Sequence, residues 1–245
     1  MEPPEIVIVG PGRLGRTVAG VLLSAGLAVQ LCGRGEDIPV AAITWLCVPD
    51  AAIAAAAARV PPGGVLLHAS GATDLDVLRP RTPVGSLHPL MTFPGPEVAT
   101  PVMAGLPAAV AGDPAARRAA ERLAAVMGWR TFEVTGDRAL YHAAAVIAGN
   151  YATTLLAVAA EVLAAAGVAA EEAPGLLAPL ALASLKNAAI AQPVRALTGP
   201  AARGDEAVIS KHRAALASVP GSASAVYDAM LLATQALLRA EKDQN

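Results

Sequence analysis

Aromatic residues and cysteines are scarce in this chain of 245 residues, and lysine is scarcer than arginine, with 3 against 15. Only 3% of the residues are aromatic, and the formal net charge is −2. Without an excess of basic side chains, a broad surface for duplex nucleic acid is not expected. The composition favours a small, weakly charged ligand and argues against a nucleic-acid partner.

The two cysteines, Cys32 and Cys47, lie in apolar, strand-like stretches rather than at metal-ligand spacing. We therefore expect reduced core thiols in a cytoplasmic protein, and no metal site. The opening residues MEPPEIVIVG lack a cationic region and a long apolar segment. A secretory signal is therefore not expected.

The stretch from Ala139 to Ala170 is apolar and long enough to cross a bilayer. It nevertheless contains polar side chains such as His142, Asn150 and Glu161, and it lacks flanking lysine clusters. We expect a buried core helix and no membrane partner. Such a helix is covered either by neighbours in its own subunit or by a second subunit.

Residues 1–135 alternate between β-branched runs and helical segments, which predicts an α/β domain with a doubly wound, mostly parallel sheet. The expected strands lie near Glu5–Val9, Ala28–Cys32, Ile43–Val48, Val65–His68, Pro83–Leu87, Ala108–Ala111 and Thr131–Val134. The expected helices between them are Leu14–Ala25, Ala51–Ala58 and Pro114–Met127.

From Gly136 onward the strand signal disappears, which predicts an all-helical C-terminal domain over residues 136–245. The expected helices are about Arg138–Ala166, Ala170–Leu176, Pro179–Ala191, Asp205–Ala217 and Ser222–Glu241. The change in pattern places a domain boundary near residue 136.

The stretch IVIVGPGRLGRTVAGVLLSAG places Gly10, Gly12 and Gly15 between an apolar strand and an amphipathic helix. Gly10 permits the tight turn, Gly12 lets a pyrophosphate approach the backbone, and Gly15 lets helix and strand pack closely. The helix N-terminus, with Arg13 and Leu14, offers N–H groups and a partial positive charge to the anion. We expect a dinucleotide-binding domain of the Rossmann type over residues 1–135; a glycine turn without a ligand is the alternative.

The end of the second expected strand bears on the choice of dinucleotide. An Asp or Glu usually takes the ribose hydroxyls of NAD there, but Cys32 and Gly33 occupy that place and Arg34 follows. Glu36 and Asp37 lie beyond the expected position. A guanidinium in place of the acid favours the 2′-phosphate of NADP; an ordinary exposed loop charge is the alternative for Arg34.

Two further strand ends, in WLCVPDAAI and LLHASGATD, are expected to face the same ligand. In an open parallel sheet the binding crevice lies beyond the carboxyl ends of the strands. The candidate cofactor contacts there are Val48, Pro49, Ser70 and Gly71. We expect Asp50 to cap the following helix and His68 to be hydrogen-bonded in the core.

In GSLHPLMTF, His88 directly follows the fifth expected strand, and Pro89 would fix the turn that aims it. Histidine exchanges a proton near neutral pH and can also hydrogen-bond a substrate oxygen. His88 is thus a candidate catalytic residue. A structural hydrogen bond in a loop is the alternative.

The helical half supplies a polar stripe, since helical spacing places His142, Asn150, Thr153, Thr154 and Glu161 within one arc. Buried polar groups need partners. The stripe therefore faces a substrate or forms a hydrogen-bonded seam between helices.

Further candidates in the helical half are Lys186, Asn187 and Arg203. In SLKNAA, Asn187 is the better substrate contact because Lys186 can extend to solvent. Arg203 can bind a carboxylate or remain exposed. Asp205 is expected to cap the next helix, and His212 is expected to be structural.

Four motifs together resemble a family of short proteins with a Rossmann-like N-terminal domain and a C-terminal helical domain of uncharacterised type. The motifs are GPGRLG, SLHPLMTF, YHAAAVIAGNY and ALTGPAARGD. The family looks like a branch of the 6-phosphogluconate-dehydrogenase-like superfamily, which also holds ketopantoate reductases, pyrroline-5-carboxylate reductases and prephenate dehydrogenases. The resemblance implies an NADP-linked oxidoreductase with its active site between the domains. It also implies that residues 136–245 bind substrate and form a homodimer.

One position departs from the related enzymes. Ketopantoate and hydroxyacid enzymes commonly carry a proton-donating Lys four residues before an Asn on the first long helix. Asn150 matches that Asn, but Val146 stands at the Lys position. Prephenate dehydrogenases have a similar His-Pro turn whose His contacts the oxidised hydroxyl. By that similarity His88 polarises or protonates the reacting oxygen and Asn150 orients substrate and nicotinamide, with His142 and Lys186 as reserve donors.

The resulting hypothesis is hydride transfer between NADP(H) and the carbonyl carbon of a small keto or hydroxy acid, as in ketopantoate reductase. Three alternatives stay open: oxidation of a prephenate-type hydroxy acid, reduction of an imine, and NADP binding without turnover. The expected partners are a small organic acid and a second copy of the chain.

Overall fold

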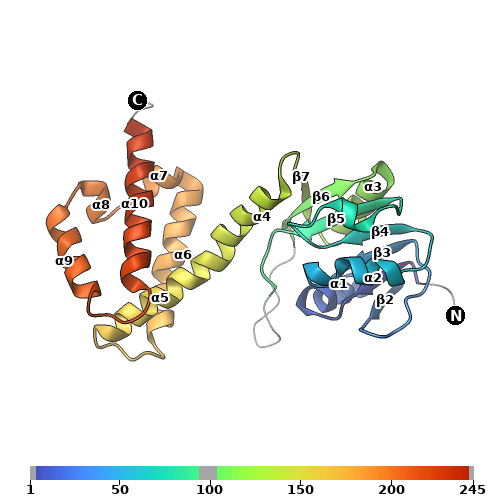
Figure 1. The fold of residues 1–245 in the computed structure, drawn as a ribbon, viewed down its shortest axis with the longest axis horizontal. Coiled ribbons are helices and arrows are strands. Elements are labelled where there is room, and N and C mark those ends of the chain that lie inside the picture. Colours follow the sequence, from blue (N-terminus) through green and yellow to red (C-terminus); the bar gives the residue numbers. More distant parts are fainter. Residues whose placement is uncertain (1–3, 94–103, 243–245) are drawn as a thin grey trace. The chain divides into compact units, whose positions relative to one another are not determined.

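The computed structural model describes residues 4–93 and 104–242, and the chain divides into two compact units, Met1–Gly149 and Asn150–Asn245 (Figure 1). The division lies within the long helical segment rather than near residue 136, where the strands end. The first helix after the sheet therefore belongs to the sheet unit. The roles assigned to the two parts of the chain stay predictions.

The first unit contains a seven-stranded sheet in the order β2-β1-β3-β4-β5-β6-β7. The strands are β1 (Ile6–Val9), β2 (Val29–Cys32), β3 (Ile43–Leu46), β4 (Val65–His68), β5 (Val84–Pro89), β6 (Pro107–Gly112) and β7 (Arg130–Glu133). Neighbouring strands run parallel except β5 and β6. The expected doubly wound, mostly parallel sheet is confirmed. Its topological switch point lies between β1 and β3, where ligands of such sheets bind.

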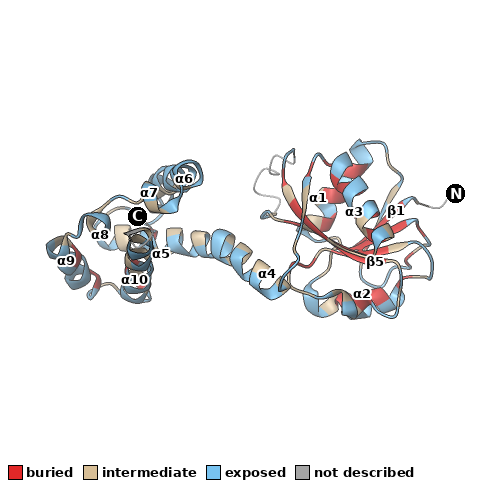
Figure 2. Cartoon of the chain, turned by 90° about the horizontal axis from the view of Figure 1, so that it is seen from above, coloured by how far each residue is buried: buried red, intermediate tan, exposed pale blue. Residues whose placement is uncertain are grey.

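Helices cover both faces of this sheet (Figure 2). Helices α1 (Arg13–Ser24) and α3 (Pro114–Val126) pack on one face, and α2 (Ile53–Arg59) packs on the other. Because both faces are covered, the central strands are continuous apolar runs. In β1, Ile6 and Ile8 belong to the core under α1, while Val7 and Val9 belong to the core under α2.

Strand β5 extends further than expected, because antiparallel pairing with β6 continues through His88 and Pro89. His88 lies opposite Ala109, and the ladder is continued by Leu90, whose N–H donates to the carbonyl of Pro107 at 2.8 Å. Pro89 is the last residue of β5 and does not form the expected turn. The expectation that His88 follows the strand in a loop is wrong: the sheet itself fixes its position.

The long helical segment consists of α4 (Arg138–Val146), a π-helical turn η3 (Ile147–Tyr151) and α5 (Ala152–Ala165). A π-turn inserts one extra residue, so the arc expected for an uninterrupted α-helix does not continue across it. Few residues of the segment are fully buried, since only 6% of its most apolar window is buried in the single chain. Burial by neighbours in the same chain, one of the two alternatives considered, is therefore wrong.

The rest of the helical unit contains α6 (Ala173–Ala191), α7 (Pro193–Ala196), α8 (Pro200–Arg203), α9 (Glu206–Leu216) and α10 (Ala223–Lys242). The two helices expected over Ala170–Leu176 and Pro179–Ala191 are the single helix α6, with Pro179 inside it. Flanking alanines and leucines favour helix strongly enough to offset one proline. Asp205 caps α9 as expected, accepting from the N–H of Val208 at 3.1 Å.

Candidate functional site

The turn between β1 and α1 contains three glycines, and at two of them, Gly10 and Gly15, any other residue would be strained. Gly10 has φ +109°, and a Cβ there would lie 2.5 Å from the carbonyl oxygen of Cys47. A Cβ on Gly15 would lie 2.0 Å from the carbonyl oxygen of Gly10. Gly12 is exposed, and no atom lies within 4 Å of the place where its Cβ would be. The open surface over Gly12, at the switch point of the sheet, fits a dinucleotide pyrophosphate.

The start of α1 leaves its backbone N–H groups available to such an anion. Gly12 is the N-cap, and no side chain caps the helix. Arg13 is exposed, whereas Leu14 packs against the core. Arg16, which was not predicted from the sequence, donates from Nε to the carbonyl of Pro11 at 2.7 Å and so holds the turn.

The end of β2 carries a carboxylate as well as a guanidinium. Arg34 is exposed. Glu36 lies beyond the expected acid position in the sequence, but its side chain folds back, and Oε2 accepts from the N–H of Gly33 at 2.6 Å. The compact turn through Gly35, at φ +87°, allows this return. Both charges therefore lie where a dinucleotide ribose is expected.

The ends of β3 and β4 are joined by a hydrogen-bonded network around Ser70. Its hydroxyl donates to Asp50 Oδ2 at 2.8 Å and accepts from the N–H of Thr73 at 2.9 Å. Asp50 makes no capping bond in the short helix η1 (Asp50–Ala52), so the expected cap is wrong. Its carboxylate binds Ser70 instead. Val48 and Pro49 lie between β3 and η1, next to this network.

His68 is fully buried at the end of β4, and its Nδ1 accepts from the N–H of Ser70 at 3.1 Å. Burial, with a further contribution from the positive charge of Arg138, lowers the pKa of His68 to about 4. The expected hydrogen bond is thus present at Nδ1. Within the described residues, Nε2 has no hydrogen-bond partner.

Two predicted residues, His88 and His142, converge with the predicted cofactor turn at Gly71. The two imidazole rings are 6.1 Å apart, centre to centre. A Cβ on Gly71 would lie 2.9 Å from His88 Nε2 and 2.9 Å from His142 Cδ2. Glycine at this position therefore lets both rings approach the end of β4.

Tyr141 and Arg138, neither of which was predicted from the sequence, complete the cluster. The hydroxyl of Tyr141 lies 2.6 Å from His88 Nδ1. Arg138 donates to the carbonyl of Ser70 at 2.8 Å and, from Nε, to the carbonyl of Thr73 at 3.1 Å. The spacing of Arg138, Tyr141 and His142 places them on one face of a helix. That spacing was a signal from which the two residues could have been found.

The electrostatics of the cluster favour neutral His88 and Tyr141 side chains. Burial, followed by the positive charges of His142 and Arg138, lowers the pKa of His88 to about 4, and only Asp50 opposes the shift. Burial also raises the pKa of the Tyr141 phenol. At neutral pH the cluster can therefore donate and accept hydrogen bonds through an uncharged imidazole and a phenol.

The remaining predicted residues lie on other elements, in the helical unit. Asn150 is in the π-turn, Lys186 and Asn187 are on α6, and Arg203 ends α8. All four are exposed. Their roles in catalysis and substrate binding stay predictions.

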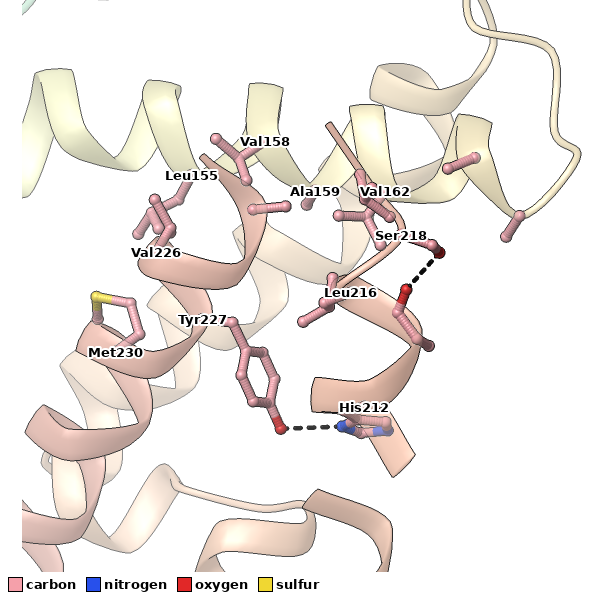
Figure 3. A pocket seen from close by; sticks show the side chains of 15 residues that line it. Leu155, Val158, Ala159, Val162, His212, Leu216, Ser218, Val226, Tyr227 and Met230 are labelled. Carbon is pink, nitrogen blue, oxygen red and sulfur yellow. Dashed lines mark hydrogen bonds between the residues drawn. The ribbon is translucent and has the colours of Figure 1, made fainter. Parts of the chain in front are cut away.

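A pocket of about 730 Å³ lies among α5, α9 and α10 within the helical unit (Figure 3). Its wall is mostly apolar, with Leu155, Val226 and Met230 among the lining residues. His212 and Tyr227 lie at one side, and the Tyr227 hydroxyl is 3.0 Å from His212 Nδ1. This bond agrees with the structural role expected for His212. The four predicted residues of the helical unit are not among the side chains that line the pocket.

A mostly parallel sheet with a glycine turn at its switch point, followed by helices, defines a Rossmann-like protein with a helical C-terminal region. Residues 106–234 match the family described as a domain of unknown function, DUF2520. The chain belongs to this family, which confirms the resemblance inferred from the motifs.

Solved structures share this fold across nearly the whole chain. A protein from Thermotoga maritima is 22% identical with a TM-score of 0.75, and the match covers 97% of this chain and 99% of that one. A protein from Bacteroides fragilis described as an NADP oxidoreductase is 20% identical with a TM-score of 0.78, covering 95% and 98%. A reductive aminase from Aspergillus terreus, in complex with NADPH and ethyl levulinate, is 20% identical with a TM-score of 0.66, covering 99% and 95%.

One curated relative matches part of the chain. The glycerol-3-phosphate dehydrogenase (NAD(P)+) of Gloeobacter violaceus is 28% identical in an alignment of 145 positions that covers 53% of this chain and 48% of that protein. The chain therefore spans about half the length of this relative.

Proposed function

We propose that this protein is an NADP-dependent oxidoreductase that transfers hydride between the nicotinamide and the carbonyl carbon of a small keto or hydroxy acid. The observation that carries the proposal is the arrangement at one edge of the sheet. Strands β1, β3, β4 and β5 run parallel, so their carboxyl ends lie at the same edge of the sheet. The open turn at Gly12 is at this edge, and so is the cluster of His88, His142 and Gly71. The dehydrogenase and NADP-linked relatives support this reading.

The cofactor would be held first by the β1–α1 turn. The N–H groups at the start of α1 would take the pyrophosphate, over the open surface at Gly12. Arg34 would face the 2′-phosphate of NADP. The carboxylate of Glu36 already accepts a hydrogen bond from the N–H of Gly33. To contact the ribose, it would have to break this bond or accept a second one from a ribose hydroxyl. Gly71, Val48 and Pro49 would line the path toward the nicotinamide.

A bound nicotinamide supplies the hydride, and the chain supplies hydrogen bonding and orientation. In the direction of reduction the carbonyl carbon gains the hydride, the C=O electron pair moves to oxygen, and that oxygen takes a proton from solvent water. A neutral His88 donating a hydrogen bond would stabilise the negative charge that develops there. Asn150 would orient the substrate, and Asn187, Lys186 and Arg203 are the candidates for binding its carboxylate.

The test is an assay of NADPH and NADH oxidation with a panel of small 2-keto acids. We expect turnover with NADPH preferred, and we expect His88→Ala to lower the rate by about 10²- to 10⁴-fold. The NADPH dissociation constant should change little, because His88 is proposed to meet the substrate. His212→Ala, at an exposed histidine of the helical unit, is the matched control and should keep full activity.

A fully active His88→Ala enzyme would remove the role given to His88. Turnover confined to cyclic imines or to a prephenate-type hydroxy acid would move the proposal to those substrate classes. Tight NADPH binding with no turnover on any of them would favour a protein that binds the nucleotide without chemistry.

We also propose that the protein is a cytoplasmic homodimer formed through its helical unit. Leu180, Leu182 and Ile190 on α6 are 66%, 67% and 75% exposed in the single chain. Apolar side chains gathered on one helix need cover in water. A second copy of the same helix would supply it.

A further inference from the structure

The contact between His88 and Tyr141 joins two elements that are far apart in the sequence. His88 is on β5 and Tyr141 on α4, and the phenol oxygen is 2.6 Å from Nδ1. The rings meet edge to face, 5.5 Å between centres and 90° between planes. Both residues are half-buried, so water competes weakly for the bond.

The position of Tyr141 is set independently of His88. The side chain of Asp137 caps α4, accepting from the N–H groups of Ala139 at 2.6 Å and Leu140 at 3.3 Å. Arg138 ties the first turn of α4 to the carbonyls of Ser70 and Thr73. The helix thus presents the Tyr141 hydroxyl to the imidazole from a fixed place.

The chemistry of the two groups allows the bond two directions, each tied to one tautomer of His88. A phenol is a good donor, and a neutral imidazole has one nitrogen that accepts and one that carries hydrogen. Burial keeps both groups uncharged at neutral pH. When the Tyr141 hydroxyl donates to Nδ1, the hydrogen of the imidazole is left on Nε2, because the bond made by one ring nitrogen fixes the tautomer.

The far edge of the same ring faces Gly71. A Cβ at that position would be 2.9 Å from both Cε1 and Nε2 of His88. We propose that Tyr141 is a positioning residue that fixes His88 in the Nε2–H tautomer, with this N–H directed toward a ligand oxygen beside Gly71. The proposal rests on the proposed function and deepens it, since it assigns His88 the role of hydrogen-bond donor to the reacting oxygen.

The charged and titratable groups around His88 act on its protonation but do not choose between its nitrogens. His142 and Arg138 on α4 oppose a second proton on the ring. His88 in turn contributes to lowering the pKa of His68 on β4. Asp50 favours that proton, but burial outweighs it. The tautomer is therefore decided by the directional bond to Tyr141.

The proposal is tested by long-range ¹H–¹⁵N NMR of the full chain with labelled histidine and without ligand. The chain has 4 histidines, and the signals of His88 are identified by their loss in His88→Gln. We expect the Nε2–H tautomer in the wild type and a mixture of both tautomers in Tyr141→Phe. A wild-type His88 with hydrogen on Nδ1, or an unchanged tautomer in Tyr141→Phe, would overturn the proposal.

The chain carries its own control for this experiment. His212 and Tyr227 form the same kind of pair, with 3.0 Å between hydroxyl and Nδ1 and rings 5.8 Å apart at 87°. Tyr227→Phe should change the signals of His212 and leave those of His88 as they are. If Tyr141→Phe does not fold, the wild-type spectrum alone decides, since hydrogen on Nδ1 contradicts the proposed direction of the bond.

Kinetics separate this proposal from the proposed function. We expect Tyr141→Phe to lower kcat on the order of 10- to 100-fold, the range known for partners that orient metal-binding histidines, with the NADPH dissociation constant within about twofold. If the NMR spectra show the Nε2–H tautomer but no substrate is turned over, the assignment of Tyr141 stands and the proposed function is removed. Turnover that depends on His88, with full kcat in Tyr141→Phe, would remove the positioning role alone.

Discussion

His68 and Ser86 lie opposite each other in the register of β4 and β5, and both are fully buried. Within the described residues, His68 Nε2 and Ser86 Oγ lack a hydrogen-bond partner. Side chains opposite each other on neighbouring strands point to the same face of the sheet, and buried polar atoms normally share a partner or an internal water.

The burial of His68 makes the stability of the protein depend on pH. Its pKa is lowered from 6.5 to about 4 in the folded chain, so between these values the unfolded chain binds more protons. The free energy of unfolding should therefore fall as the pH falls through this window. A shift of this size corresponds to a loss of about 3 kcal/mol, and the lowered pKa of His88 acts in the same direction.

Denaturant unfolding between about pH 7 and pH 4 measures this loss. His68→Asn keeps an acceptor for the N–H of Ser70, since Asn makes the same two-residue turn, and it removes the titrating group. Its stability should depend less steeply on pH than that of the wild type. His212→Asn, at an exposed site, should keep the wild-type slope. An unchanged slope in His68→Asn would show that His68 does not carry the effect.

At the scale of single residues, the sequence predicts part of the cluster and misses part. His88 and His142 can be found because histidine near a strand end and on a polar helix face signals proton chemistry. The partnership of His88 with Tyr141 spans 53 residues and requires β5 to be extended by an antiparallel neighbour. Local sequence patterns do not indicate contacts between residues this far apart in the chain.

At the scale of elements, the strands are well predicted because buried parallel strands are short apolar runs between glycine and proline turns. The strand Val65–His68 coincides with β4, and the others shift by a few residues. The π-turn at Ile147–Tyr151 and the continuous helix through Pro179 are missed. Both depend on small free-energy differences between alternative helical conformations, and the spacing of apolar residues does not indicate such differences.

The β1–α1 turn offers an element-scale prediction, because Gly12 and Gly15 differ in what surrounds them. Gly12 has φ −74°, which suits any residue, and open space around its missing Cβ. We expect Gly12→Ala to keep its Tm within about 2 °C but to bind NADPH at least about tenfold more weakly, because the methyl group would occupy the place of the pyrophosphate. Thermal unfolding and NADPH titration measure the two effects.

Gly15→Ala is the matched comparison. Its Cβ would lie 2.0 Å from the carbonyl oxygen of Gly10, so the turn must shift, at a cost of about 1–3 kcal/mol in the free energy of unfolding. We expect Gly15→Ala to lose both stability and NADPH binding. Wild-type NADPH affinity in Gly12→Ala would show that the turn does not hold the phosphates.

At the scale of the whole molecule, two features could not be predicted from the sequence: the boundary between the two units and the surroundings of the apolar helices. Composition places the change near residue 136, but α4 packs on the sheet unit through Arg138 and Tyr141, which moves the division to Gly149. The segments Arg138–Ala165 and Ala173–Ala191 are long and apolar enough to cross a membrane by length and composition, and little of either is buried in the single chain.

We expect a dimer by size-exclusion chromatography with light scattering. Leu180→Glu combined with Ile190→Glu, at two exposed apolar positions of α6, should yield a monomer, because two carboxylates cannot be buried unpaired in an apolar interface. Ser210→Glu, at an exposed position of α9, should leave the dimer intact. A wild-type monomer at all concentrations would contradict the homodimer, and sedimentation of the protein with lipid vesicles would point to a membrane instead.

Gly71 has a consequence for how this protein can evolve. Its glycine is required by space rather than by backbone conformation, since two histidine rings already stand where a Cβ would be. Every codon change that alters this residue adds that Cβ, so a lineage has no single-step route to another residue while both rings keep their places. Loss of either histidine would open the position to drift, and a return of the histidine would then require the glycine to be restored first.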